Sequence, residues 1–398
     1  MSFAASNVSS IQAAASGRRA LAGFLLSGFL LALLGAILPA WGYHRDPPDF
    51  VGVGNCFLSV AAGLTASLPL AWRILARRGL RFLLVFACLL ACAALLYLAM
   101  VSPPLSAWWR AAGLLVLGMS AGLLNVALFQ GLSQGYTSDA AGTVIQGGIW
   151  YGLGCLAATL LVEGAFYTPV SAILILMAAA PAIFAGIYFH TPCSFPLLSA
   201  QPSFRQAMRD FRSLGAILFA LLLFFQFGNE WSLAGWLPLF LCHRVGMSPQ
   251  AALFTLALYW FFLMAGRFAA TALLPRVRHG RLLLGSSLAA LFGLVVLYYT
   301  NNAFGAITGV FFLGAGFASI YPLVSEAIGR RFPYYHPGFS NGIFSLALLG
   351  GLIAPATLGY AAAATGDVGV VVGIPLLGTF IVVALLLLIW LESKVTGR

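Results

Sequence analysis

The sequence has 398 residues, of which 62% are hydrophobic and 7% are charged, and its mean hydropathy is +1.00. Soluble domains carry about 25% charged residues, so a chain with so few would lack an adequate surface in water. A bilayer removes the need for a polar exterior, and the length allows many membrane spans. The composition therefore excludes an ordinary soluble protein.

The charged residues that remain are mostly basic, with 20 Lys and Arg against 9 Asp and Glu and a formal net charge of +11. Nucleic-acid binding would need a basic soluble face, and no segment offers one. The excess is instead typical of loops on the cytoplasmic side of a membrane protein. The six cysteines show no CxxC motif and no Cys/His cluster, so we expect no metal site and no cofactor. Cys56 and Cys242 could form a disulfide, although packing is the simpler role.

Along the chain, residues 1–19 are polar and do not resemble a cleaved signal peptide. A membrane span needs about 20 mainly apolar residues. Twelve stretches meet this condition, at 20–42, 50–73, 81–101, 107–133, 140–164, 169–190, 213–241, 248–274, 281–300, 303–328, 338–363 and 368–391. We therefore predict an all-α membrane protein of twelve transmembrane helices.

The basic residues orient these spans. With the N-terminus in the cytoplasm, sixteen of them fall on the cytoplasmic side, three fall on the other side and Arg267 lies inside a span. The cytoplasmic set is Arg18, Arg19, Arg73, Arg77, Arg78, Arg81, Arg205, Arg209, Arg212, Arg276, Arg278, Arg281, Arg330, Arg331, Lys394 and Arg398, and the opposite set is Arg45, Arg110 and Arg244. This asymmetry predicts that both termini are cytoplasmic. We expect the protein to be a multi-pass protein of the inner membrane.

The two halves of the chain repeat each other weakly. The segment RRGLRFLL at 77–84 precedes VRHGRLLL at 277–284 by 200 residues, and LGMSAG at 117–122 precedes LGAGFA at 313–318 by 196. The nearly constant offset predicts two pseudo-symmetric six-helix bundles with a site between them. The predicted parts are a cytoplasmic tail at 1–19, bundles at 20–190 and 213–391, a cytoplasmic linker at 191–212 and a second tail at 392–398.

These features resemble the major facilitator superfamily over nearly the whole chain. The basic turns after the second and eighth helices carry the resemblance, as do glycine-rich stretches such as GAGFASIYP. Within the superfamily, FGNEWSLAGWLPLFL in the seventh helix is similar to the pattern of fucose and glucose–galactose permeases, with Gly228, Glu230, Gly235 and Trp236 matching by position. The resemblance implies a sugar transporter, by symport or facilitated diffusion, that works through alternating access.

Two departures from the family pattern bear on mechanism. Neither basic turn carries the aspartate that the family places before the arginines. The first helix has no carboxylate, and the fourth has Asn125 where this branch commonly has an acid. Proton coupling by the usual residues is therefore not expected. Glu230 could carry the coupling, or the protein could be a facilitator.

The seventh helix also has the most informative polar residues, Gln226, Asn229 and Glu230. A charge at the centre of a membrane helix costs about 2.5–3.5 kcal/mol on insertion scales, so such residues normally face a cavity or a partner. We predict that all three bind substrate and that Glu230 also binds the coupling proton. The alternative is a protonated Glu230 held by neighbouring amides in a structural role.

Further candidates lie on other helices that border the central cavity in this superfamily. Amides can donate to and accept from solute hydroxyl groups, and aromatic rings can contact the apolar face of a sugar. The remaining substrate-binding candidates are Asn125, Gln146, Trp150, Asn341, Tyr259, Tyr321 and Phe344. For each aromatic residue, ordinary packing is the alternative.

Arg267 is the one basic residue well inside a span, and Glu326 lies near the cytoplasmic end of the tenth helix. Arginine can extend its side chain toward the membrane surface, so we predict that the two form a cytoplasmic gate pair. A pair with only a structural role is the alternative.

The leading functional prediction is a monomeric secondary transporter of a small polar solute, a sugar or polyol, with a coupling proton and membrane lipid as its other partners. The alternatives are an exporter of amphipathic compounds or drugs, and a receptor or scaffold that does not transport. The five histidines form no HExxH motif and no GxxxxGK[ST] motif occurs, so we do not expect an enzyme. The sequence leaves the solute, the direction of transport and the coupling ion open.

Overall fold

The computed structural model describes residues 2–132, 140–190, 211, 213–332 and 342–396. Within these residues, eleven helices are long and apolar enough to cross a membrane. They are α1 (Ser2–Ala40), α2 (Phe50–Met100), α3 (Ala107–Gly131), α5 (Ala140–Glu163), α6 (Val170–His190), α8 (Leu214–Val245), α9 (Pro249–Leu273), α10 (His279–Tyr299), α11 (Ala303–Arg331), α12 (Gly342–Thr365) and α13 (Val370–Thr396). These helices confirm the prediction of an all-α membrane protein.

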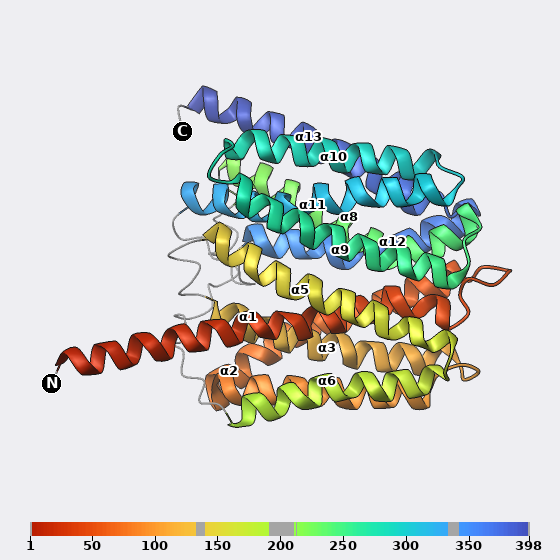
Figure 1. Cartoon of the computed structure of the whole chain (residues 1–398), viewed down its shortest axis with the longest axis horizontal. Coiled ribbons are helices and arrows are strands. Elements are labelled where there is room, and N and C mark those ends of the chain that lie inside the picture. Colours follow the sequence, from red (N-terminus) through yellow and green to blue (C-terminus); the bar gives the residue numbers. More distant parts are fainter. Residues whose placement is uncertain (1, 133–139, 191–210, 212, 333–341, 397–398) are drawn as a thin grey trace.

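Helix α2 covers two of the predicted spans and breaks at Gly79, where φ is 79° and ψ is 175°. Glycine adopts such a conformation without the steric cost of a side chain. A straight helix of its 51 residues would be about 77 Å long, more than twice the hydrocarbon core of about 30 Å. In Figure 1 the orange ribbon of α2 instead stays within the length of the bundle.

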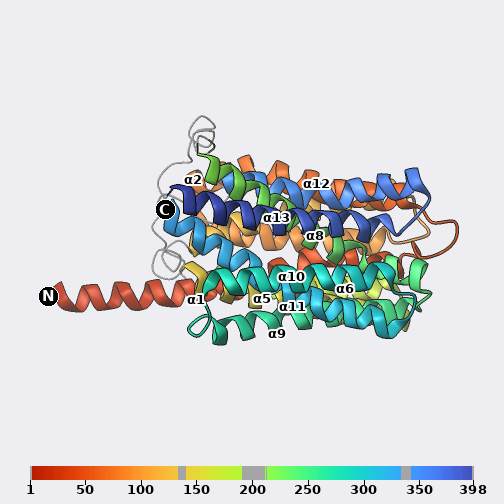
Figure 2. The ribbon, with the colours of Figure 1, turned by 90° about the horizontal axis from the view of Figure 1, so that it is seen from above.

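The helices run side by side along the long axis of the molecule, and both chain ends lie at the same end of it (Figures 1 and 2). We call this the terminal end, and the opposite one, with the turn between α1 and α2, the far end. The first part of α1 projects beyond the bundle at the terminal end (Figure 2). The sequence predicted a polar tail over 1–19, whereas α1 is helical from Ser2 onward, because this segment is rich in alanine, a strong helix former.

Local signals in the sequence set several helix starts. Ser213 precedes α8, and its hydroxyl accepts the backbone N–H of Ala216 at 3.2 Å. Ser248 precedes α9, whose first residue is Pro249, and Asn302 caps α11. Such caps satisfy N–H groups that have no partner within the helix. This is essential where the ends approach an apolar phase.

The outward faces of the helices are apolar. Ile183, Leu377 and Phe380 are each about 60% exposed, and they belong to α6 and α13. Apolar surface of this extent is unfavourable in water and matches a lipid environment. Polar side chains that can act on a solute must therefore be sought between the helices.

Close contacts at glycine bring pairs of helices together. Where α1 packs against α5, a Cβ on Gly28 would lie 1.9 Å from the carbonyl oxygen of Tyr151. Where α8 packs against α12, a Cβ on Gly350 would lie 2.1 Å from the carbonyl oxygen of Phe224. Only glycine fits at these positions. Small residues have this role widely in membrane bundles, because they let two backbones approach closely.

We expect Gly154→Ala to destabilise the protein, because a Cβ there would lie 1.8 Å from the carbonyl oxygen of Leu25 in α1. Overpacking of this kind typically costs about 1–3 kcal/mol. The thermal unfolding midpoint of the purified protein measures the effect. Gly186→Ala in α6 is the matched control, since no atom lies within 4 Å of its Cβ position. Equal midpoints for the two variants would contradict the packing described.

Candidate functional site

A cavity of about 140 Å³ lies in the middle of the bundle, and we call it the central cavity. Its wall includes side chains from α1, α2, α3, α5, α8, α9, α11 and α12. Helices from both halves of the chain therefore contribute to it. The residues that line it are Phe24, Leu31, Leu64, Asn125, Phe129, Leu132, Thr143, Val144, Gly147, Gly148, Tyr151, Phe227, Glu230, Trp231, Arg267, Tyr321, Phe344 and Leu348.

Two side chains of opposite charge, Glu230 on α8 and Arg267 on α9, meet at the wall of this cavity. The Nη2 atom of Arg267 lies 4.0 Å from Oε1 of Glu230. Only 9% of Glu230 and 6% of Arg267 is exposed. Each charge compensates the other in a place where an isolated charge would be costly. Among the described residues that line this wall, they are the only acidic and basic ones.

Arg267 also connects the two halves of the chain. Its Nη1 atom donates a hydrogen bond to the carbonyl oxygen of Gly148 on α5. A Cβ on Gly148 would lie 2.7 Å from the guanidinium carbon, so a larger residue there would make the arginine shift. The hydrogen bond joins a long basic side chain on α9 to the backbone of α5 at a glycine.

The three polar residues predicted on α8 have different surroundings. Glu230 lines the central cavity, as described. Gln226 is fully buried beside the same carboxyl group, but its amide makes no hydrogen bond of ordinary geometry. Asn229 points away, since its Nδ2 donates to Oγ1 of Thr379 on α13 at 3.1 Å. The structure therefore places Asn229 in a helix contact, because the next position along a helix is turned by about 100°.

Three further candidates lie at the central cavity. Asn125 lines it, although its amide is already engaged: Ser27 Oγ donates to its Oδ1 at 2.9 Å, and its Nδ2 donates to the carbonyl oxygen of Ala121. Tyr321 and Phe344 form part of the aromatic wall, and both pack against Phe227. Their ring centroids lie 5.0 and 5.8 Å from that of Phe227.

Tyr259 lies near the cavity without lining it. It is fully buried on α9, and its ring contacts that of Trp260 at a centroid distance of 5.0 Å. Its hydroxyl group has no hydrogen-bond partner. Tyr259 is close enough to Glu230 and Arg267 to interact electrostatically with both charges. In this conformation it can act on the central cavity only through these two residues.

Two candidates on α5 are not brought to the cavity. Gln146 is exposed, Trp150 is 39% exposed, and neither lines the cavity. The inward face is instead the one with Gly147, Gly148 and Tyr151. Sequence reasoning chose the polar and aromatic residues one position away. The pair of adjacent glycines was the signal that could have identified the packed face, because small residues mark close helix contacts.

Arg267 and Glu326, the predicted gate pair, are not paired in this conformation. Glu326 lies on α11 with its carboxylate 3.4 Å from Nδ1 of His279, and it also pairs with Arg330 one turn further along. Arg267 is engaged with Glu230 and Gly148. The sequence does not distinguish between two acidic partners for Arg267, because the choice depends on which helices are neighbours. Asn341, the remaining candidate, lies outside the described residues.

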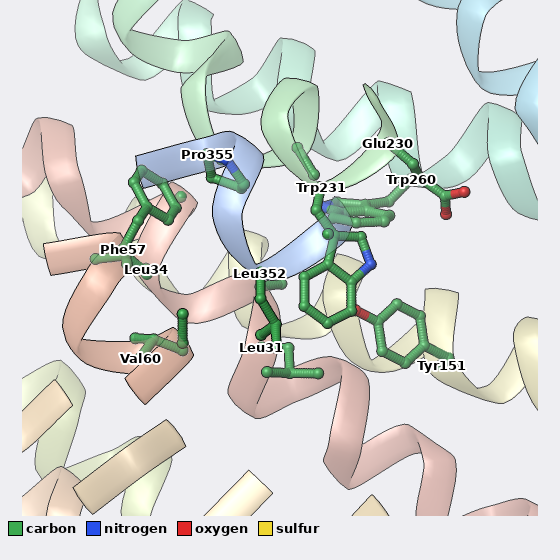
Figure 3. Close-up of a pocket in the computed structure, with 16 residues that line it drawn as sticks. Leu31, Leu34, Phe57, Val60, Tyr151, Glu230, Trp231, Trp260, Leu352 and Pro355 are labelled. Carbon is green, nitrogen blue, oxygen red and sulfur yellow. The ribbon is translucent and has the colours of Figure 1, made fainter. Parts of the chain in front are cut away.

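A second, smaller cavity of about 60 Å³ lies toward the far end. It shares Leu31, Tyr151, Glu230 and Trp231 with the central cavity. Figure 3 shows this second cavity, with Glu230 and Trp231 on one side of it and Phe57 on the other. Glu230 therefore lines both cavities. Sequence reasoning missed Tyr151 and Trp231, although Trp231 is adjacent to the selected glutamate.

Beyond the second cavity, side-chain contacts hold the two halves together at the far end. The Trp236 ring stacks on Phe57 with centroids 5.8 Å apart, and within its own half its Nε1 donates to the carbonyl oxygen of Pro355 at 2.8 Å. Tyr360 donates to Asn55 Oδ1 at 2.7 Å. In this conformation α2 is therefore held against α8 and α12 at this end.

The turn between α1 and α2 adds a polar cluster at the same end. Tyr43 accepts a hydrogen bond from Nη2 of Arg110 at 3.3 Å, and its carbonyl oxygen lies 3.4 Å from Nε2 of His243. Burial raises the pKa of Tyr43 to about 12, so its phenol stays neutral in the physiological range. Cys56 lies 3.9 Å from this phenol, and both Cys56 and Cys242 are free thiols.

We expect the charges of Glu230 and Arg267 to be energetically coupled. Glu230→Gln leaves an arginine that cannot lose its proton, and should cost about 1–3 kcal/mol of unfolding free energy. Arg267→Gln should cost less, because the remaining carboxyl group can take up a proton. The double variant should recover part of the loss. Thermal unfolding of the four proteins in one detergent measures this, and effects that add within about 0.5 kcal/mol would contradict the coupling.

We expect Gly359→Val to keep the far end from closing, because a Cβ on Gly359 would lie 2.7 Å from the Cα of Gly54 across the contact of α12 and α2. Cys56, two residues after Gly54 on α2, is 2% exposed and should react faster with a maleimide in the variant. The assay uses protein in which Cys56 is the only cysteine, with Gly186→Val as the control. Unchanged labelling of Cys56 would contradict the expectation that the contact of Gly359 with Gly54 keeps the far end closed.

Comparison with known proteins shows which fold the chain shares with them. No family model matches the chain. A stretch of 139 residues, 34% of this chain, is 28% identical to a Helicobacter pylori protein named as a glucose/galactose transporter, and the match spans only 33% of that relative's length.

Solved structures resemble the chain over nearly its full length. The fucose:proton symporter FucP of E. coli matches with a TM-score of 0.62 and 14% identity, covering 94% of this chain and 98% of that one. The nucleoside transporter NupG matches with a TM-score of 0.69 and 16% identity, covering 94% and 99%. Similarity at this level of identity establishes the architecture alone. The chain therefore has the fold of these two solved transporters, which agrees with the architecture that its resemblance to the major facilitator superfamily implied.

Proposed function

We propose that this protein is a secondary transporter that moves a small polar solute across the cell membrane by alternating access. One observation carries the proposal: Glu230 and Arg267, two buried opposite charges, line a cavity to which both halves of the chain contribute. Ionisable residues inside a membrane protein typically mark a substrate or ion pathway. A cavity between two halves is the place where transporters of this fold type bind their solute.

The two halves are two six-helix bundles, 20–190 and 213–391, with twelve spans if each segment of α2 is one span. The glycines that fix helix contacts support this reading. Gly228 lies 200 residues after Gly28, and Gly350 lies 196 residues after Gly154. The first pair lies on α1 and α8, and the second on α5 and α12. Equivalent contacts at the offset of the sequence repeat are expected from two related bundles. Since both bundles lie in one chain, a monomer is sufficient.

The terminal end faces the cytoplasm in this proposal. It holds both chain ends (Figure 1), and the sixteen basic residues on one side of the predicted spans support this orientation. The far end then faces outward. The central cavity extends toward the terminal end, since Leu132 and Thr143 at the ends of α3 and α5 line it. The structure thus corresponds to a state from which the solute exchanges with the cytoplasm.

Glu230 is the proposed site of proton coupling. The described part of α1 has no acidic residue after the start of its span, and α3 has Asn125. Glu230 is thus the only carboxylate among the described residues that line the cavity. It also borders the second cavity. A carboxyl group that borders both cavities can exchange a proton with either side as the bundles rock. This change of charge would then bias which side opens.

A ring-shaped solute with hydroxyl groups, such as a sugar, is the first candidate for transport. FucP carries fucose with a proton, NupG carries nucleosides, and the H. pylori relative is named for glucose and galactose. All three solute classes include a ring with hydroxyl groups. The aromatic wall of the central cavity supports such a solute, because aromatic faces pack against the apolar face of a sugar ring.

The second candidate is an exporter of amphipathic compounds. The central cavity has more aromatic and aliphatic side chains than polar ones, which favours a solute with a large apolar part. Uptake and efflux assays in vesicles of defined orientation separate the two functions. A scaffold without transport activity would show no solute flux in either direction.

We expect Glu230→Gln to abolish solute uptake or to remove its dependence on a proton gradient. The measurement is uptake of labelled fucose, glucose, galactose and uridine into proteoliposomes, with and without an inward proton gradient. Size-exclusion profiles of the variant establish that it is folded. Asn229→Ala is the matched control, since Asn229 contacts Thr379 and not the cavity. Proton-driven uptake at the wild-type rate by Glu230→Gln would remove the proposed coupling role.

A further inference from the structure

One edge of the Arg267 guanidinium group is not used by the protein. Its Nη1 atom donates to Gly148, whereas its buried Nε atom has no hydrogen-bond partner. Its Nη2 atom lies 4.0 Å from Glu230, which is longer than a hydrogen bond. Nε and Nη2 form the fork that binds a carboxylate with two parallel hydrogen bonds. A buried donor without a partner is costly, so this edge is poised for an acceptor from the cavity.

Glu230 compensates the charge of Arg267 without binding this edge tightly. The two groups attract each other across 4.0 Å, but the geometry lacks the short contacts of a bidentate pair, which are about 2.7–2.9 Å. The carboxyl group can also be neutralised by a proton, whereas arginine keeps its charge. Protonation of Glu230 would therefore leave a full positive charge at the cavity wall, with Nε and Nη2 of Arg267 available to an acceptor.

We propose that the solute is a small organic anion whose carboxylate binds the Nε and Nη2 edge of Arg267 while Glu230 takes up a proton. This inference rests on the proposed transport function and names the class of its substrate. The net charge at the site stays constant: an anion enters as the negative charge of Glu230 is removed. The site then binds anion and proton together, and a neutral solute has no equivalent way to compensate the arginine.

The rest of the cavity wall indicates what the anion looks like. Rings from Phe24, Phe129, Phe227 and Phe344 surround the cavity, and they suit a flat six-membered ring. Few polar groups remain for hydroxyl groups, since the Asn125 amide already bonds to Ser27 and Ala121. We therefore infer a carboxylate attached to a ring. An aromatic acid satisfies this description best, and a sugar acid is the comparison that tests whether hydroxyl groups are also accepted.

Glu230 is the proton acceptor at this site among the residues that the structure describes. The other titratable groups that face the pair are the hydroxyl groups of Tyr151, Tyr259 and Tyr321 and the thiol of Cys155. Phenols and thiols are normally protonated at neutral pH and cannot take up a further proton. Proton uptake with the anion must therefore occur at Glu230. Anion affinity should rise as pH falls, by up to about tenfold per unit if one proton is bound with each anion.

The test compares matched ligands on the purified full chain. The pairs are benzoate with benzyl alcohol, and glucuronate with glucose, each titrated calorimetrically at pH 5.5 and pH 7.5. At least one anion should bind about tenfold or more tightly than its neutral partner, which is about 1.4 kcal/mol. It should bind more tightly at the lower pH, and buffers of different ionisation enthalpy should reveal proton uptake.

Three variants separate the roles of the two charges. Glu230→Gln should bind the anion with little dependence on pH, because it mimics the protonated state. Arg267→Gln should lose the preference for the anion over its neutral partner. Arg281→Gln is the charge-matched control, since Arg281 is exposed at the start of α10, away from the cavity. It should retain both the preference and the pH dependence.

The outcomes distinguish this inference from the proposed function. If a neutral ligand binds as well as its anion, or if neither anion binds, the inference is overturned. Uptake of a neutral solute into proteoliposomes would then leave the transport function standing. If no neutral or anionic solute crosses the membrane in either direction, the proposed function fails as well. Anion binding that Arg267→Gln leaves intact would also overturn the assignment of this edge.

Discussion

A buried arginine that cannot lose its charge is the constraint around which the middle of this bundle is arranged. Arg267 must be compensated where water is scarce. The chain supplies Glu230 at 4.0 Å and the backbone carbonyl of Gly148. The first partner lies in the same half of the chain and the second in the other half. Any motion that separates the halves therefore acts directly on the charge balance of this arginine.

The far end of the bundle is tightly packed and the region around the central cavity is not, because different kinds of contact form in the two places. At the far end, close glycine contacts and the Trp236 ring join α2 with α8 and α12, and such contacts exclude water. Around the central cavity, aromatic rings and two charges leave space. Because packed interfaces have discrete arrangements, a change of charge at Glu230 can shift the balance between a closed and an open far end. This is the physical link between proton binding and solute movement in the proposed mechanism.

Alternating access also requires the far-end contacts to break. Across the boundary between the halves, Trp236 contacts Phe57 by ring stacking, and Tyr360 and His243 each make one side-chain contact with the other half. Gly54 and Gly359 also bring the backbones of α2 and α12 close together there. Since these contacts lie at one end of the two bundles, relative rocking of the bundles would separate them together.

The sequence by itself determined the membrane class, the helical spans and the importance of Glu230, because composition, hydropathy and a buried carboxylate are local properties. It also pointed to Asn125, Tyr321 and Phe344. Only the tertiary structure decided which partner Arg267 takes and which face of α5 points inward. Glu326 was as plausible as Glu230 along the chain, and the exposed Gln146 and Trp150 looked better than Gly148 and Tyr151. The choice of partner depends on which helices are neighbours and on how each helix is rotated about its own axis. A hydrophobic pattern of period 3.6 in a single sequence determines neither of these.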